Sequence, residues 1–198
     1  MTIPSHHLFE DERFRGLSLV ETTVEESTFD GCSFSDVAFV ECALTSCRFI
    51  DCTFLRCDFS MTSVEGSRFS GASFQESRFM ALDWTKAQWK AGFVAPLSFE
   101  RCMLKHVTFL GLEMEAWRFI DSEVIDVDFR EGCLRRADFS GTDLRESLFH
   151  HTDLREADFS KARNYRIAAS ENDVAGARFS LPEAMSLLYD LEIILTDR

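Results

Sequence analysis

Apolar residues recur at every fifth position over most of this chain. The series starts at Phe9, passes through Phe14 and Leu19, and continues without a polar interruption to Leu154 and Phe159. It comprises 31 positions in one phase, and 18 of them are phenylalanine. Helices repeat their buried positions about every 3.6 residues and strands about every 2, so a period of five predicts a repeat architecture.

A slower repeat of 20 residues runs through the first half of this series. Every fourth position there lacks phenylalanine, as at Val24, Leu44, Val64 and Trp84. Four five-residue units therefore form one coil, each unit being a short extended side with a corner. The spacing predicts an all-β solenoid, a quadrilateral parallel β-helix in which each coil contacts only its neighbours. About eight coils of about 4.8 Å each give a rod roughly 38 Å long.

The solenoid predicts which side chains stack in the core. We expect one column to contain Phe29, Phe49, Phe69, Trp89, Phe109, Phe129 and Phe149. We expect a second column to contain Phe39, Phe59, Phe79, Phe99, Phe119, Phe139 and Phe159. Phe34 and Phe54 belong to the same core. Burying a large apolar side chain contributes about 1.5–3 kcal/mol, so the series supplies a self-sufficient core.

Most of the cysteines follow the same period. Six of the seven stand two residues before a central position, and only Cys133 does not. Other occupants of this position are small, such as Ser27, Val37 and Ala72. A buried thiol packs as a small hydrophobic group, so we interpret the cysteines as packing residues and expect no disulfide or metal site from their spacing.

The segment 84–99 is the irregular part of the series. It brings together two tryptophans, a glycine and Pro96, which cannot donate to a strand ladder. The phase survives, so any insertion there must be a multiple of five residues. The segment is either a kink or irregular coil, or a protruding contact surface.

The C-terminal segment changes character after residue 163. We predict a pentapeptide solenoid over 1–163 and a cap over 164–198. Ser180, Pro182 and Glu183 are typical of a helix start, with serine and glutamate forming a capping box. A solenoid end must be covered, and the helix can also join two rods end to end. The predicted dimer interface consists of Phe179, Leu181, Met185, Leu188 and Leu191.

The charge is strongly negative, at −13, and concentrated in two bands. Residues 10–60 carry a net −7 and residues 121–160 a net −6. This balance argues against nucleic-acid binding through basic patches. A solvated exterior explains the acids; alternatively, the rod imitates a polyanion at about half the charge density of DNA. The candidate partner-binding acids of the second band are Asp128, Asp138, Asp143, Asp153 and Asp158.

Motifs that carry chemistry are missing from the sequence. We find no nucleophile motif, glycine-rich phosphate loop or HExxH, and expect neither an enzyme nor a cofactor or metal. The N-terminus shows no signal-peptide pattern, and no apolar stretch approaches the roughly 18 residues of a spanning helix. We therefore expect a reduced, cytoplasmic protein.

The units "ADFSG", "TDLRE" and "ADFSK" resemble the pentapeptide-repeat family, and the likeness covers about three quarters of the chain. The resemblance implies a right-handed four-sided β-helix, in agreement with the usual hand of parallel crossovers.

A narrower resemblance concerns function. Residues 83–89, 97–104, 164–165 and 177–193 are similar to the albicidin-resistance pentapeptide-repeat protein and, in the tail, to the quinolone-resistance Qnr proteins. This implies a homodimeric, DNA-mimicking partner of DNA gyrase, and often of topoisomerase IV, that protects it from topoisomerase poisons. Many Qnr solenoids are interrupted by out-of-phase loops, and the unbroken phase here predicts none. The alternative is a generic interaction scaffold with another partner.

Overall fold

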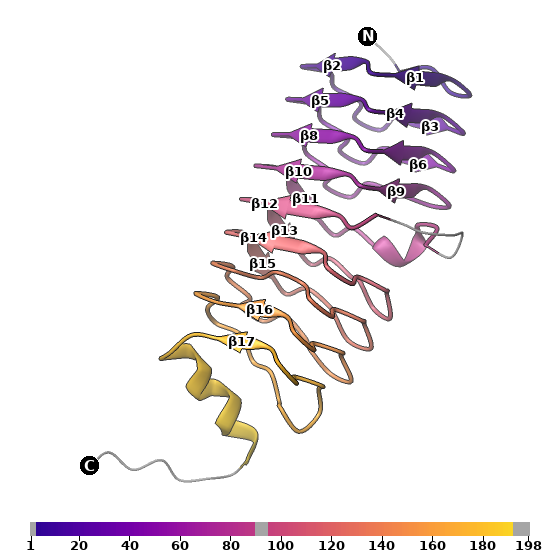
Figure 1. Ribbon diagram of the computed structural model, residues 1–198. Coiled ribbons are helices and arrows are strands. Elements are labelled where there is room, and N and C mark those ends of the chain that lie inside the picture. Colours follow the sequence, from indigo (N-terminus) through magenta and orange to yellow (C-terminus); the bar gives the residue numbers. More distant parts are fainter. Residues whose placement is uncertain (1–2, 90–94, 192–198) are drawn as a thin grey trace.

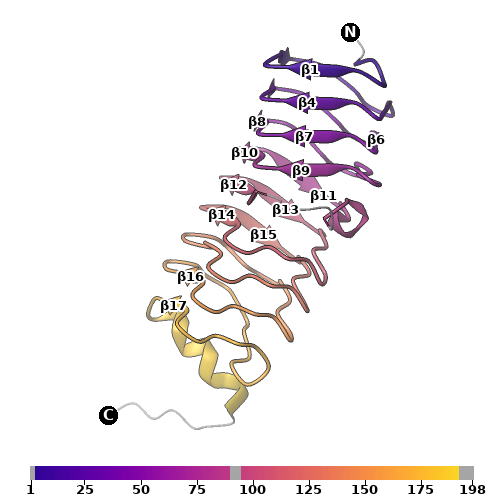
Figure 2. The ribbon, with the colours of Figure 1, turned by 45° about the vertical axis from the view of Figure 1, so that its right-hand side comes forward.

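The computed structural model describes residues 3–89 and 95–191. The chain winds into a parallel, four-sided β-solenoid of about eight coils, as the sequence predicts (Figures 1 and 2). Strand β1 (Leu8–Glu10) and helix η2 (Glu183–Leu191) lie at opposite ends of the rod (Figure 1). All paired strands are parallel and two or three residues long.

We number the sides 1 to 4 in chain order. Side 1 contains β1 (Leu8–Glu10), β4 (Thr28–Asp30), β7 (Arg48–Ile50) and β9 (Arg68–Ser70). Side 2 contains β2 (Arg13–Arg15), β5 (Ser33–Ser35), β8 (Thr53–Leu55), β10 (Ser73–Gln75), β12 (Ser98–Glu100), β14 (Arg118–Ile120), β16 (Asp158–Phe159) and β17 (Arg178–Phe179). Side 3 contains β11 (Arg78–Met80), β13 (Met103–Lys105) and β15 (Glu123–Ile125). Side 4 contains β3 (Thr23–Glu25) and β6 (Ala43–Thr45). Isolated parallel bridges continue the ladders between and beyond these strands.

The corners explain the period of five. Nearly every side ends, two residues after its central apolar residue, at a residue with positive φ, such as Asp11 at 55° or Gly16 at 62°. This left-handed conformation costs a non-glycine residue roughly 1–2 kcal/mol, which the stacking of the coils must offset. A three-residue strand plus a corner therefore fits one pentapeptide.

Stacked phenylalanine rings form the core. On side 2 the column runs from Phe14 to Phe179, and consecutive ring centroids lie 4.8–5.2 Å apart. The ladder of this side thus reaches Phe179, within the segment 164–198 that the sequence assigned to the cap.

Both predicted columns are wrong where they cross the segment 84–99, because Phe99 does not stack on Phe79 and Phe109 does not belong to the column of Phe69. Phe74 pairs with Phe99, Phe79 with Leu104, and Trp84 stacks on Phe109. Each of these separations is 25 residues, whereas the other steps are 20. The coil between Phe74 and Phe99 therefore contains one additional five-residue unit. Such a unit leaves the five-residue phase unchanged, so the sequence pattern could not reveal it.

The additional unit lies in the irregular segment. Trp84 opens a short 3-10 helix, η1 (Trp84–Lys86), which Asp83 caps by accepting a hydrogen bond from the Thr85 N–H at 2.9 Å. Trp89 packs against Trp117 with ring centroids 5.3 Å apart and donates from Nε1 to the Trp84 carbonyl at 2.8 Å. The described parts of the segment, residues 84–89 and 95–99, keep the phase. The choice between an irregular coil and a protruding contact surface depends on residues 90–94, which lie outside the described residues.

The cysteines pack as expected at the small inward positions. Cys32, Cys42, Cys47, Cys52, Cys57 and Cys102 are buried, and Cys133 is half-buried. Five of the thiols donate to backbone carbonyls, namely those of Cys32, Cys47, Cys52, Cys57 and Cys102; the Cys52 Sγ lies 3.3 Å from the Phe29 oxygen. All seven are free thiols.

Candidate protein-interaction surface

The five candidate aspartates of the second acidic band do not share one side of the rod. Asp153 lies in the ladder of side 1, Asp143 in that of side 3 and Asp128 in that of side 4. Only Asp138 and Asp158, which are bridge partners on side 2, are neighbours. The predicted group therefore cannot act as a single acidic face.

Three of these aspartates are neutralised by the arginine two residues later in the sequence. Asp128 pairs with Arg130 at 2.7 Å, and Asp153 with Arg155 at 2.5 Å. The hydrogen bonds from these guanidinium groups lower the pKa of both carboxyl groups. In each Asp-x-Arg motif the aspartate lies in a parallel bridge and the arginine in the turn that follows, which brings the two side chains together on the outside of the coil. The motif is visible in the sequence, but a count of charge per band hides it.

Asp143 is the most enclosed member of the group, and its contacts indicate a structural role. Its carboxylate lies 3.0 Å from the Arg145 Nη2 and 3.3 Å from the Arg163 Nε, and accepts from the Asn164 Nδ2 at 2.8 Å. Only 5% of its side chain is exposed. Burial raises its pKa, but the hydrogen bonds from Asn164 and Arg145 outweigh this effect and leave the pKa below its usual value.

Asp138 and Asp158 are the pair that remains closest to the prediction. Each accepts a hydrogen bond from a backbone N–H two residues later, at 3.0 Å from Ser140 and 2.8 Å from Ser160. Arg178 approaches Asp158 at 3.6 Å and has most of its side chain exposed. Two carboxylates therefore stand side by side on side 2, about 4.8 Å apart along the ladder.

Uncompensated acid is more extensive in the first band than in the second. Residues 16–47 contain no lysine or arginine. Within the described part of the chain, no ion pair is formed by the exposed carboxylates of Glu21, Glu25 or Glu41. The charge count predicts the band but no individual residue in it. The absence of lysine and arginine from residues 16–47 is the sequence feature that indicates which acids lack a counter-charge.

The C-terminal helix is η2 (Glu183–Leu191), a 3-10 helix beside the last coil (Figures 1 and 2). Of the predicted dimer residues, Leu181, Met185 and Leu191 are exposed and Leu188 is half-buried. Phe179 instead closes the side 2 column, stacked on Phe159 at 5.0 Å. The structure therefore separates one core residue from an exposed apolar group on the cap.

The predicted capping box does not form. The Ser180 Oγ accepts from the Lys161 N–H at 3.0 Å, and the Glu183 carboxylate accepts from the Asn164 N–H. Both side chains thus satisfy backbone donors at the end of the solenoid in place of donors of their own helix. A buried backbone N–H without a hydrogen-bond acceptor is costly. By accepting from the N–H groups of Lys161 and Asn164, the two side chains attach the cap to the rod.

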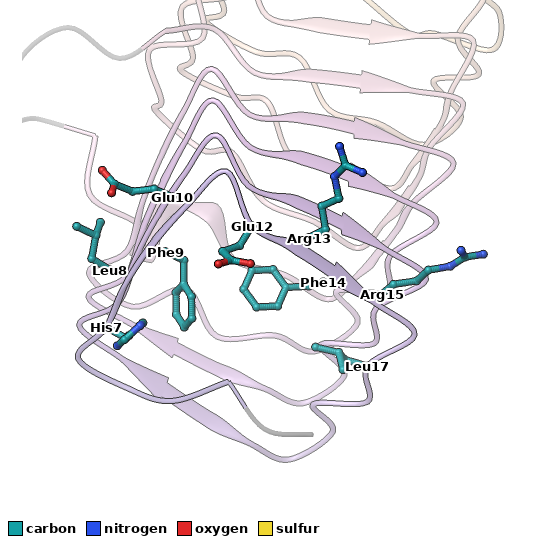
Figure 3. Close-up of a pocket in the computed structure, with 9 residues that line it drawn as sticks. All are labelled: His7, Leu8, Phe9, Glu10, Glu12, Arg13, Phe14, Arg15 and Leu17. Atoms are coloured by element: carbon teal, nitrogen blue, oxygen red, sulfur yellow. The ribbon is translucent and has the colours of Figure 1, made fainter.

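The opposite end of the solenoid is open (Figure 3). A hollow of about 640 Å³ lies there, and Figure 3 shows the rings of Phe9 and Phe14 turned into the coil, with Glu10, Arg13 and Arg15 turned away from it. Within the described residues, β1 and β2 have a partner strand on one edge only. The hollow is an exposed end of the core without a converging set of catalytic groups.

The described residues carry neither a metal-ligand cluster nor a membrane-spanning helix. No cluster of three or more His, Cys, Asp or Glu side chains there could hold a metal ion. Over the same residues, no helix has the length and apolar character needed to cross a membrane.

The repeat, the parallel ladders and the ring columns correspond to a known family. The family model for the pentapeptide repeat region matches residues 22–93 and 84–159, together more than half of the chain. The chain belongs to the pentapeptide-repeat family. No curated protein matches this pentapeptide-repeat protein in sequence.

Solved structures share the fold over nearly the whole length. A trypsin-treated variant of QnrB1, a plasmid-mediated fluoroquinolone resistance protein, superposes with a TM-score of 0.74 at 14% identity, covering 98% of this chain and 100% of that chain. A second trypsin-treated QnrB1 variant reaches 0.64 at 16% identity, with coverages of 96% and 99%. HetL from the cyanobacterium Nostoc, a pentapeptide repeat protein involved in heterocyst differentiation regulation, reaches 0.56 at 13% identity, with coverages of 87% and 85%. At these identities the likeness shows the fold alone.

Proposed function

We propose that this protein binds DNA gyrase, with topoisomerase IV as a further candidate, and protects it from topoisomerase poisons such as albicidin or quinolones. The observation that carries the proposal is the likeness to QnrB1, which extends over 98% of this chain. The rod shape and the charge of −13 support a DNA mimic that occupies the DNA-binding surface of the enzyme. In this role the protein is a cytoplasmic binding protein that needs no catalysis, cofactor or nucleic acid.

Asp138 and Asp158 are the proposed contact residues of the second acidic band. They are adjacent on side 2. Asp138 forms no ion pair with any described residue, and Asp158 forms one, with Arg178 at 3.6 Å. Asp128, Asp143 and Asp153 are less available to a partner because arginines already neutralise them. If Asp138 and Asp158 contact the enzyme, charge reversal at these two residues weakens gyrase binding.

The proposal includes a homodimer joined through the C-terminal segment. The exposed apolar side chains of Leu181, Met185 and Leu191 support it, because exposed apolar groups on a cap favour burial against a second copy. Two rods joined end to end would double the length of negatively charged surface offered to the enzyme.

A gyrase supercoiling assay tests the proposal. Purified protein is titrated into relaxed plasmid, gyrase and ATP, with and without albicidin or a quinolone. Restored supercoiling in the presence of drug, at protein concentrations that do not inhibit gyrase alone, is the expected result. The D138K/D158K variant should lose this effect, whereas E131K/E156K, with the same charge change at exposed corners of sides 4 and 1, should retain it.

A scaffold with another partner is the alternative function. The likeness to HetL favours it, since the same fold serves a protein of differentiation regulation. The gyrase proposal would be overturned in favour of the scaffold if the protein neither protected nor inhibited gyrase and topoisomerase IV from its host.

A further inference from the structure

The edge between sides 3 and 4 in the first four coils combines exposed apolar side chains with uncompensated acids. We propose that this edge, lined by Val20, Val40, Met61 and Met80 and bordered by Glu21 and Glu41, binds a cationic amphipathic helix of a partner protein. The inference concerns a different surface from the side 2 aspartates and does not depend on gyrase being the partner.

The apolar residues of this edge are in register along the rod. The Glu21 N–H donates to the Val40 carbonyl, and the Met61 N–H donates to the Met80 carbonyl, at 3.1 and 2.8 Å. Val20, Val40 and Met80 therefore occupy equivalent positions in the first, second and fourth coils. In the third coil this position is the buried Ser60, and Met61 at the adjacent corner supplies the apolar side chain. Val20 is 46% and Met61 53% exposed. Scattered single apolar residues need no explanation on a protein surface, but an aligned row of them indicates a contact site.

The acids lie beside this row. Glu21 and Glu41 occupy the same corner in consecutive coils, both with positive φ, so their side chains leave the rod at neighbouring points. Glu25 and Glu65 follow on the adjacent part of side 4, and all four are exposed. None of the four forms an ion pair with any residue that the structure describes. Clustered carboxylates without counter-charges attract a cationic partner and repel nucleic acid and anionic lipid.

The repeat distance of the edge fits a helix. Coils stack at about 4.8 Å, and successive turns of an α-helix rise about 5.4 Å. A helix that lies along the rod can therefore place one apolar side chain against each coil for about three turns before the mismatch exceeds about 2 Å. Lysine or arginine on the flank of the helix that faces side 4 would meet Glu21 and Glu41 at the corner, with Glu25 and Glu65 farther along the same direction. Apolar anchors at helical spacing are a feature of the way in which amphipathic helices are recognised.

Another apolar site on the rod lacks this combination. Leu110 and Leu148 are exposed on side 4 of later coils, at 40% and 44%. Asp128, whose backbone bridges those of Thr108 and Leu148, forms an ion pair with Arg130 there. The two leucines provide matched controls because their exposure is similar and their charge environment is balanced.

The test measures binding of a fluorescein-labelled 18-residue peptide of leucine and lysine with helical amphipathic order. We expect the intact protein to bind it at least tenfold more tightly than a peptide of the same composition in scrambled order. The V20S/M61S variant and the E21Q/E41Q variant should each weaken binding about tenfold. L110S/L148S and E131Q/E156Q should change it less than twofold. All variants alter exposed side chains, and circular dichroism before the titration verifies that each is folded.

Two outcomes overturn the proposal. Equal affinity for the ordered and scrambled peptides would show attraction to net charge alone. Equal losses in the edge variants and the matched controls would show that the edge is not the site. A supercoiling assay on V20S/M61S separates the two proposals, since protection through side 2 should survive in it.

Discussion

Phe74 and Phe99 stack face to face, with ring centroids 5.0 Å apart and planes at 11°, although 25 residues separate them. All other steps of this column span 20 residues. The coil between them holds one unit more than its neighbours, and the stacking on both sides is undisturbed.

This relationship predicts that residues 90–94 can be deleted in phase. The shortened chain has a 20-residue coil throughout, so every later central residue keeps its column. The thermal midpoint should change by less than about 4 °C, which corresponds to about 1 kcal/mol for a protein of this size. Deleting only residues 91–93 should lower it further, because the remaining residues no longer make a whole unit. Equal thermal midpoints for the two deletions would argue against the five-residue unit as the repeating element of the solenoid.

Buried thiols predict a loss of stability at alkaline pH. Burial raises the pKa of Cys42, Cys52, Cys57 and Cys102 to about 12 from an ordinary 9.0. The unfolded chain releases these protons above about pH 9 and the folded chain keeps them, so the free energy of unfolding falls as pH rises from 9 to 12. Each thiol contributes a slope of about 1.4 kcal/mol per pH unit in that window.

Urea unfolding at pH 8, 9 and 10 measures this slope. Other groups also titrate there, so the comparison is with the C42A/C57A variant, which is less stable at pH 8 but should lose stability more slowly with pH. Parallel losses in the two proteins would contradict the assignment of the slope to the thiols.

Asp143 should matter for stability more than for partner binding. Its carboxylate accepts hydrogen bonds from Arg145 and Asn164 and forms a further ion pair with Arg163, and removing an acceptor of charged donors costs about 1.5–3 kcal/mol. We expect D143A to lower the free energy of unfolding by about 2 kcal/mol. D138A, which removes an acceptor from one backbone N–H, should cost about half as much. Chemical denaturation of the two variants decides between these values.

The exposed apolar group of the cap predicts self-association. Sedimentation equilibrium should give twice the 22.7 kDa of one chain. The L181E/M185E variant should sediment as a monomer, because two charges would be buried without partners in the interface. L110E/L148E introduces the same charges on side 4 and should remain dimeric. If the unmodified protein itself sediments as a monomer, the proposed end-to-end dimer is contradicted.

Much of the fold could be predicted because one physical constraint repeats. A corner every five residues requires an inward large residue and an inward small one, so Phe34, Phe54 and Cys52 could be placed from spacing alone. The additional unit before Phe99 could not be found, since an insertion of one whole period leaves no trace in the phase. Leu104 beneath Phe79 is visible only when the coils are stacked.

The surface was less predictable than the core. Charge counted along the chain grouped Asp128, Asp143 and Asp153, whereas the ladder sends each to a different side and pairs each with an arginine. The same limitation applied to Ser180 and Glu183. A capping box and a bond to another coil need the same side chains, and only the position of the cap against Lys161 and Asn164 decides between them.

The central claim is tested most directly by competition between this protein and DNA for gyrase. Gyrase is immobilised and the binding of the protein is measured with increasing concentrations of linear duplex DNA at fixed salt. The account predicts saturable binding that the duplex displaces and that D138K/D158K weakens at least tenfold, with E131K/E156K close to the unmodified protein. Absence of binding, or binding that DNA does not displace, would contradict a DNA mimic at the DNA-binding surface of gyrase.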